Sequence, residues 1–291
     1  MPHTRYTTLI SADSLAQRLA QTPADTIIFD CRFDLADPDA GLDAYSVAHI
    51  DGSHYLHLDH DLSGPRTGSN GRHPLPDRHG LAHTLAACGL NRDMQVVAYD
   101  AQGGIYAARL WWLLRWLGHE AVAVLDGGLQ AWIAAGHAVV VDPTLPQHAT
   151  GNFVAGKPLA TAVGVSEIEQ NLQTRAELVI DARAPDRYRG ENETLDPRGG
   201  HIPGALNRFF KDNLTGEGRF KPGHVLRDEF SAVIGAHPVE RVVLQCGSGV
   251  TACHNALAME LAGLHGAALY GGSWSEWSAD PARPIATGAT P

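Results

Sequence analysis

The chain has 291 residues, of which 44% are hydrophobic and 19% charged, so it is long enough for two globular domains with separate cores. Its formal net charge of -10 disfavours nucleic acid and anionic membranes as partners. The N-terminus lacks the apolar run of a signal peptide, and four cysteines are too few for a disulfide scaffold. We therefore expect a cytoplasmic protein with reduced thiols, no membrane association and no nucleic-acid partner.

In the first half of the sequence, short apolar runs end at Asp, Cys or Gly and alternate with helical patterns. "TIIFDCRF" (26–33) and the apolar start of "VVAYDAQGGIYAARLWWLL" (96–114) predict buried strands. "AARLWWLLRWLGH" (107–119) predicts a helix that closes near a glycine, and a long polar loop is expected over 59–77. The segment "DPTLPQHATGNFVAGKPLATA" (142–162) is rich in Pro, Gly, Thr and Ala and reads as a linker.

The second half repeats the first. "LVIDARA" (178–184), "GHIPGALNRFFKD" (200–212) and "LYGGSWSEW" (269–277) echo earlier segments in the same order, at offsets between 144 and 152 residues. We predict domains over 1–143 and 161–291, joined by a linker over 144–160. Continuous apolar strands between helices predict a mainly parallel sheet with helices on both faces, an α/β fold that binds ligands at the carboxyl ends of its strands.

A cysteine stands at one such strand end, in "VVLQCGSGVTACHNALAMELAGL" (242–264). Gly247 and Gly249 let the backbone curl with its N–H groups aimed at the sulfur of Cys246, while Ser248 and Thr251 add hydroxyl donors. The pattern "TACHNALAMELAGL" (251–264) predicts a helix directly after this turn. Such a turn before a helix favours the nucleophilic thiolate. The alternative is a buried, inert cysteine.

The corresponding turn of the first copy has Asp100 in place of the cysteine, in "YDAQGGIYAAR". The whole pattern resembles the two-domain rhodanese-like sulfurtransferases. "CGSGVTA" is similar to the active loop of the 3-mercaptopyruvate branch, and "GHIPGA" (200–205) and "GGSWSEW" (271–277) are further family signatures. The resemblance implies two tandem rhodanese-like domains, the first catalytically inactive.

The resemblance also implies a reaction. Cys246 takes a sulfane sulfur from 3-mercaptopyruvate or thiosulfate, holds it as a persulfide, and passes it to cyanide or to a thiol acceptor such as a thioredoxin-like protein. Two half-reactions give ping-pong kinetics, with no organic cofactor or metal. Gly247, Gly249, Val250 and Thr251 are expected to bind the donor.

Three arginines lie in the segment 181–205. A guanidinium fork suits the carboxylate of 3-mercaptopyruvate, whereas thiosulfate would be expected to prefer a more basic loop. The resemblance favours Arg187 and Arg198 as the donor-binding pair and leaves Arg189 structural. The alternative for each arginine is a salt bridge to acidic residues of the same loop.

The loop 59–77 supplies further candidates. In the 3-mercaptopyruvate branch a comparable loop carries an Asp and a His that are proposed to work with the serine of the active loop. The matching residues here are Asp61, His73 and Ser248, which could stabilise charge or relay a proton. The alternative is that this loop packs at the domain interface.

Other functions and sites fit the sequence less well. A cysteine phosphatase needs an arginine six residues after the nucleophile, where this chain has Ala252. A persulfide carrier or protein-binding module remains open, because a carrier needs the thiol too. The histidines and aspartates of "HIDGSHYLHLDH" (49–60) are expected to form a polar surface rather than a metal site, and Cys253 a small packed thiol.

Overall fold

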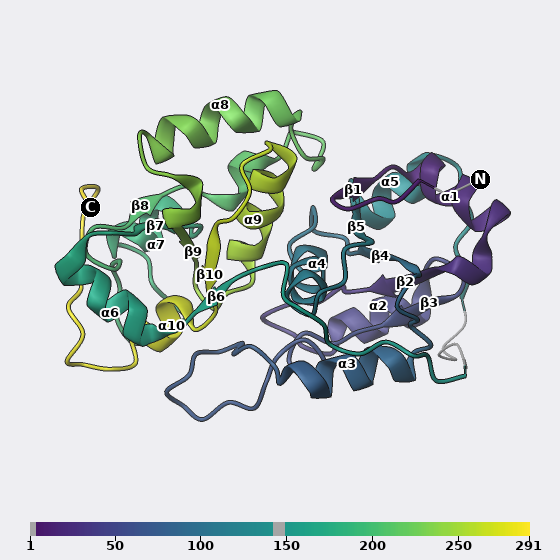
Figure 1. Ribbon diagram of the computed structural model, residues 1–291, viewed down its shortest axis with the longest axis horizontal. Helices are drawn as coiled ribbons and strands as arrows, with labels where there is room; N and C mark the ends of the chain where they lie inside the picture. Colours follow the sequence, from purple (N-terminus) through teal and green to yellow (C-terminus); the bar gives the residue numbers. More distant parts are fainter. Residues whose placement is uncertain (1–3, 142–148) are drawn as a thin grey trace. The chain divides into compact units, whose positions relative to one another are not determined.

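The computed structural model describes residues 4–141 and 149–291; part of the predicted linker, 144–148, lies outside the described residues. The chain divides into two compact units, each an α/β body around one five-stranded sheet (Figure 1). The first unit contains Met1–Ser63, Pro76–Leu159 and Gly216–Phe220, and the second contains Gly64–Leu75, Ala160–Thr215 and Lys221–Pro291. Each unit therefore includes one short segment whose neighbours in the sequence belong to the other unit: Gly216–Phe220 in the first and Gly64–Leu75 in the second.

The sheet of the first unit is parallel throughout, in the order β1-β5-β4-β2-β3. Its strands are β1 (Leu9–Ile10), β2 (Thr26–Asp30), β3 (Ser53–Tyr55), β4 (Gln95–Tyr99) and β5 (Val122–Leu125). Every residue of β2, β4 and β5 is buried. This burial explains their continuous apolar runs, because helices cover both faces of such a sheet.

Helices α1 (Ala12–Gln21) and α5 (Gly128–Ala134) cover one face of this sheet, where Leu15 and Trp132 join a core cluster with Val97 and Tyr99. Helix α4 (Ala107–Trp116) packs against β4 and β5 and is buried from Ala107 to Leu114. The remaining elements of this unit are α2 (Ala40–Val47), α3 (Arg78–Ala87) and the 3₁₀ turn η1 (Pro23–Asp25).

The second unit repeats this topology. Its parallel sheet has the order β6-β10-β9-β7-β8, which matches the first sheet strand for strand. The strands are β6 (Ala162–Val163), β7 (Leu178–Asp181), β8 (Leu206–Asn207), β9 (Val242–Gln245) and β10 (Ala268–Tyr270). The helices are α6 (Val165–Thr174), α7 (Pro185–Arg189), α8 (Gly223–Ile234), α9 (Thr251–Leu261) and α10 (Ser273–Trp277), with 3₁₀ turns η2 (Phe210–Asn213) and η3 (Val239–Arg241). The sequence prediction of two tandem, mainly parallel α/β domains is confirmed.

The repeat extends to buried side chains. In the first unit Arg32 pairs with Asp30 at the end of β2, at 2.5 Å between Nη2 and Oδ2, and also donates to the carbonyl of Ala48. In the second unit Arg183 pairs with Asp181 at the end of β7 at 2.6 Å. These ion pairs explain why the same Asp-x-Arg spacing follows both strands. Across the part of the chain that the structure describes, no helix is long and apolar enough to cross a membrane.

Candidate active site

The predicted active loop lies between the end of β9 and the start of α9. Cys246 directly follows β9, and its Sγ accepts a hydrogen bond from the backbone N–H of Gly249 at 3.1 Å. Gly249 has a φ of 78°, and a Cβ at this position would lie 2.4 Å from the carbonyl oxygen of Gly271. Only glycine therefore allows this close turn, which holds an N–H group against the sulfur of Cys246, a residue that is 1% exposed.

The segment around α10 supports this loop from the side. The hydroxyl of Ser273 accepts the N–H of Cys246 at 3.1 Å, and the N–H of Trp274 donates to the carbonyl of Cys246 at 3.0 Å. The N–H of Ser275 donates to the carbonyl of Gly247 at 2.9 Å. The "GGSWSEW" signature thus fixes the backbone on both sides of the thiol.

The segment 64–75 belongs to the same unit as this loop. It places Nδ1 of His73 2.7 Å from Oγ of Ser248, with both residues buried. Of the three residues that were expected to work together, Asp61, His73 and Ser248, the structure therefore brings together His73 and Ser248. Asp61 lies in the first unit, where its carboxylate accepts the N–H of His57 at 2.7 Å.

Two guanidinium groups face the residue that follows the thiol. A Cβ built on Gly247 would lie 3.6 Å from Nη1 of Arg187 and 3.1 Å from Nη2 of Arg72. Arg187 comes from α7, and its side chain is 21% exposed; Arg72 comes from the segment 64–75, and its side chain is 25% exposed. The predicted Arg187 is therefore beside the loop, together with an arginine that sequence reasoning missed.

Two buried carboxylates orient these arginines. Arg187 donates to Glu193 at 2.8 Å and to Asp196 at 3.3 Å, and Asp196 also pairs with Arg72. Burial acts to raise the pKa of Glu193, but the hydrogen bond from Arg187 and the N–H of Leu195 outweigh it and lower that pKa. Burial raises the pKa of Asp196, and Arg72 opposes this shift. Arg72, Asp196, Arg187 and Glu193 thus form one network of ion pairs beside the active loop.

Arg198 has a different position from the one expected. Its guanidinium donates to three backbone carbonyls of the C-terminal segment, those of Ser278 at 3.0 Å, Arg283 at 3.2 Å and Asp280. These bonds use Nε and both terminal nitrogens of the guanidinium. Arg198 therefore stabilises the backbone of the C-terminal segment. It gives no support for the expected place of Arg198 beside the donor.

The rest of the loop joins the sulfur to α9. Val250 is buried, and its carbonyl accepts the N–H of Cys253 at 3.0 Å, while Thr251 is the first residue of the helix. The thiol of Cys253 is fully buried and donates to the carbonyl of Gly249 at 3.2 Å. Cys253 thus packs inside the helix and supports the loop through a backbone contact.

The corresponding turn of the first unit holds a carboxylate. Oδ1 of Asp100 accepts the N–H groups of Gln102 and Gly104, both at 2.9 Å, and Oδ2 accepts those of Tyr106 at 2.9 Å and Ala107 at 3.1 Å. Burial raises the pKa of Asp100, and the four N–H bonds oppose that shift. The N–H groups of this turn therefore form an anion-binding site, and the carboxylate of Asp100 occupies it.

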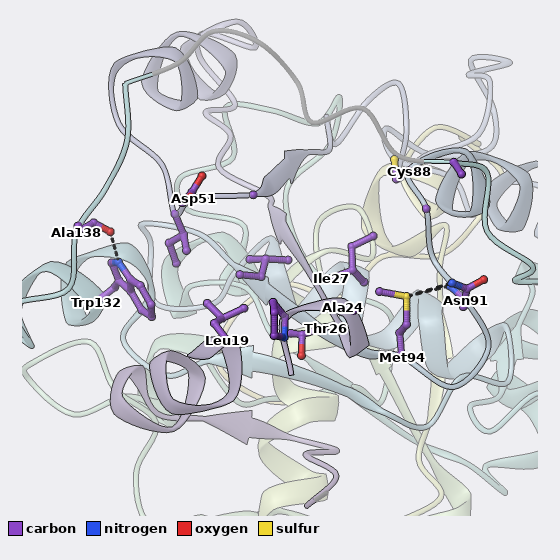
Figure 2. Close-up of a pocket in the computed structure, with 16 residues that line it drawn as sticks. Leu19, Ala24, Thr26, Ile27, Asp51, Cys88, Asn91, Met94, Trp132 and Ala138 are labelled. Carbon is purple, nitrogen blue, oxygen red and sulfur yellow. Dashed lines mark hydrogen bonds between the residues drawn. The ribbon is translucent and has the colours of Figure 1, made fainter. Parts of the chain in front are cut away.

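A cavity of about 620 Å³ opens elsewhere in the first unit (Figure 2). Leu19, Ile27 and Trp132 give it a mainly apolar lining, and Cys88 lies at its edge. Burial raises the pKa of Cys88 to about 11, so this thiol is protonated and weakly nucleophilic at neutral pH. No arginine or histidine is among the described residues that line this cavity, and we do not assign it to sulfur chemistry.

Two functional features were missed from the sequence. Arg72 directly precedes the predicted His73, and the absence of any cation in the active loop was a signal that a neighbouring segment must supply one. Ser273 lies in a recognised family signature, but its bond to the N–H of Cys246 depends on backbone geometry that the signature does not reveal. Among the described residues, no group of three or more His, Cys, Asp or Glu side chains is arranged to hold a metal ion.

Comparison with known proteins places this site in a family. The rhodanese-like domain profile matches residues 11–135 and 164–280. A Pseudomonas aeruginosa protein named probable 3-mercaptopyruvate sulfurtransferase is 47% identical over 282 residues, 96% of this chain and 98% of that protein. A Mycobacterium tuberculosis protein named putative thiosulfate sulfurtransferase SseB is 37% identical over 284 residues, 96% of this chain and 97% of that protein.

Solved structures agree with these matches. SseA from Escherichia coli, described as a 3-mercaptopyruvate sulfurtransferase, has a TM-score of 0.78 and 29% identity and covers 93% of this chain and 100% of its own. The 3-mercaptopyruvate sulfurtransferase of Leishmania major has a TM-score of 0.81 and 29% identity over 96% of this chain and 76% of its own. The chain described here belongs to the rhodanese-like family, as a tandem-domain sulfurtransferase.

Proposed function

We propose that this enzyme moves the sulfur atom of 3-mercaptopyruvate to a thiol or cyanide acceptor and carries it as the sulfane sulfur of a persulfide on Cys246. The observation that carries the proposal is the thiol at the carboxyl end of β9, bonded to the N–H of Gly249 and next to the residue that Arg187 faces. The Pseudomonas aeruginosa relative is named for this donor. The Mycobacterium tuberculosis relative is named for thiosulfate, which is the second candidate.

The chemistry balances as two displacements. The Cys246 thiolate attacks the donor sulfur, a sulfur–sulfur bond forms, and the carbon–sulfur bond of the donor breaks with its electron pair on the pyruvate enolate. The proton of the donor thiol ends on the methyl carbon of pyruvate. A nucleophilic acceptor then attacks the outer sulfur and releases the thiolate, which is the ping-pong pattern of covalent catalysis.

Movement of that proton is the role we propose for Ser248 and His73. Their 2.7 Å contact allows a proton to pass between hydroxyl and imidazole, and Ser248 is only two residues from the nucleophile. The N–H of Gly249 stabilises negative charge on the sulfur. We assign no catalytic role to Asp61, whose carboxylate is bonded to its own loop.

We further propose that the first rhodanese-like domain is catalytically inactive. Asp100 occupies the position of the cysteine, and its carboxylate uses four N–H groups of the turn. A carboxylate cannot accept a sulfur as a persulfide. The four bonds also leave those donors satisfied, so this turn is not expected to bind an external anion.

Intact-mass spectrometry after exposure to each donor tests the proposed function. We expect wild type to gain one sulfur atom, faster from 3-mercaptopyruvate than from thiosulfate, because the loop is neutral and an arginine fork suits a carboxylate. Cys246→Ser should gain none, because the nucleophile is lost. Cys253→Ser should still load, because that thiol donates to a backbone carbonyl inside α9.

Three results would count against this assignment. Loading of Cys246→Ser, or failure of Cys253→Ser alone to load, would refute the choice of nucleophile. No loading of wild type by either donor would mean that the buried thiol is inert. A chain that loads once and does not turn over with cyanide or small thiols would instead be a persulfide carrier.

A further inference from the structure

The active loop contains no cation. From Cys246 to Thr251 it consists of a thiol, small residues and one apolar side chain, yet the donor proposed above is an anion. Positive charge at the sulfur must therefore come from outside the loop. The guanidinium groups of Arg72 and Arg187 approach the loop at Gly247, where they lie next to the space that a side chain would fill.

We propose that Arg72 is a specificity-determining residue, the second cation that recognises the carboxylate of the donor beside Cys246. This inference rests on the proposed function and adds a residue to its donor site. Arg72 lies in the segment that also supplies His73. One segment would thus bring both the proton relay and the missing charge to the loop.

The structure fixes Arg72 at both ends. Its backbone N–H donates to the hydroxyl of Ser275 at 3.0 Å, and the N–H of Ser275 in turn donates to the carbonyl of Gly247. Its Nη1 pairs with Asp196, while Nη2 is the atom nearest to the position of a Cβ on Gly247. The guanidinium is therefore held in one orientation toward the loop, which lowers the entropy lost when it binds an anion.

The charge balance shows why Arg72 matters. Arg187 is bonded to both carboxylate oxygens of Glu193 through Nη2, at 2.8 and 2.9 Å, so this pair is close to neutral. Asp196 has its own partner in Arg72. Arg72, Arg187, Glu193 and Asp196 together carry no net charge, and Arg183, which also contacts Glu193, is balanced by Asp181. Removing Arg72 would therefore leave one net negative charge beside the sulfur, and that charge would repel an anionic donor.

Alkylation of Cys246 measures this charge without any sulfur transfer. Iodoacetate is an anion and iodoacetamide its neutral counterpart, so the ratio of their rates at Cys246 reports the local potential. Peptide mass spectrometry follows the modification, and glutathione added to the same solution serves as the reference thiol for each reagent. We expect Arg72→Ala to lower the iodoacetate-to-iodoacetamide ratio about tenfold, the effect of losing one nearby charge in a partly solvated site.

Two further variants complete the test. Arg72→Lys keeps the charge and should retain most of the ratio. Arg189→Ala is the matched control, because that arginine pairs with Glu191 on the exposed side of α7 and should leave the ratio unchanged. In steady-state assays Arg72→Ala should raise KM for 3-mercaptopyruvate about tenfold, with a smaller change in kcat.

The outcomes separate this inference from the proposed function. An unchanged ratio in Arg72→Ala, an equal fall in Arg72→Lys, or no alkylation of Cys246 by either reagent would overturn the role of Arg72. A falling ratio in a protein that takes sulfur from no donor would sustain the anion site and reject the sulfurtransferase proposal. A normal ratio with normal loading would reject Arg72 alone.

Discussion

After β5 in the first unit and β10 in the second, a residue with a left-handed backbone precedes the residue that bonds the turn of Asp100 or Cys246. In the first unit it is Gly128, with a φ of 60°, and in the second it is Ser273, with a φ of 54°. The next residue in each case donates its N–H to the carbonyl of the residue at the reactive turn, Asp100 or Cys246. Gly128 and Ser273 are therefore equivalent positions, and only the second unit, which has Cys246 at the turn, places a side chain there.

Ser273 has an unfavourable backbone conformation, and its hydroxyl forms a hydrogen bond to the backbone of Cys246. A left-handed φ at a residue other than glycine costs on the order of 1 kcal/mol. In return the hydroxyl of Ser273 accepts the N–H of Cys246 and donates to the carbonyl of Tyr270 at 2.8 Å. We infer that this bond sets the backbone of the nucleophile, and that stability is lost to place it there.

Substitutions of Ser273 separate the two effects. Ser273→Gly removes the hydroxyl and relieves the backbone, so we expect a free energy of unfolding within about 1 kcal/mol of wild type and slower sulfur loading of Cys246. Ser273→Ala keeps the strain and loses the bonds, and should be less stable by about 1–3 kcal/mol. Urea unfolding and intact-mass kinetics measure both quantities. Wild-type loading in the glycine variant would show that the hydroxyl has no part in positioning the thiol.

The residues at this site differ in how visible they were in the sequence. Cys246 could be singled out because a thiol between a buried strand and a glycine turn is unusual, and Arg187 because it lies in a loop of clustered arginines. Arg72 and Ser273 act through geometry: one faces a missing side chain, and the other bonds a backbone N–H. The neutral active loop indicated that a cation must come from another segment, but no periodicity or composition signal identified Arg72 or Ser273 as the residues in these positions.

Helices and strands were more predictable than side-chain roles. The helices expected over 107–119 and 251–264 are α4 (Ala107–Trp116) and α9 (Thr251–Leu261), which end earlier than the apolar pattern. Gly118 and Gly263 adopt positive φ just beyond these ends and stop each helix. The pattern therefore located the helices well, while the glycines set their last turn.

The segment from α7 to β8 holds arginines whose guanidinium groups make different contacts. Arg187 points its guanidinium toward Gly247, whereas Arg198 donates to carbonyls of the C-terminal segment. The sequence spacing is equally compatible with either role for both residues. The distinction arises because the C-terminal segment folds back beside Arg198 and offers it several carbonyl oxygens.

Matched alanine variants test this division. Arg187→Ala should raise KM for 3-mercaptopyruvate about tenfold or more, because a charged hydrogen bond to the donor carboxylate is lost. Arg198→Ala should leave that KM unchanged and lower the thermal midpoint, because several backbone carbonyls lose their donor. Steady-state kinetics and thermal unfolding provide both readouts. If the two variants exchanged these effects, the assignment of the arginines would have to be reversed.

At the level of the whole chain, the duplication was visible in the sequence and its details were not. Repeated Asp-x-Arg and His-containing segments predicted two copies, and both sheets have the same strand order. The assignment of 64–75 to the second unit and of 216–220 to the first could not be predicted, although the two segments lie close to the repeat offset from one another. These polar segments follow no helix or strand period, and their positions depend on contacts that are distant in sequence.

The duplication also gives Asp100 a structural role that can be separated from catalysis. Its two carboxylate oxygens accept four N–H groups in the turn before α4. Asp100→Asn would turn an amide NH₂ toward two of these donors, so we expect the first unit to lose about 1–3 kcal/mol of unfolding free energy. Because the proposed nucleophile lies in the second unit, sulfur loading of Cys246 per folded chain should be unchanged.

The control for this variant is Asp13→Asn, since the side chain of Asp13 is 85% exposed and its Oδ1 lies 3.1 Å from Nε2 of His137. Urea unfolding followed by intrinsic fluorescence should show a transition at lower urea concentration in Asp100→Asn and an unchanged transition in Asp13→Asn. A folded Asp100→Asn protein that no longer loads Cys246 would mean that the turn of the first unit takes part in the reaction. Unchanged stability would mean that the four hydrogen bonds to Asp100 contribute little, and that a carboxylate is not what holds this turn closed.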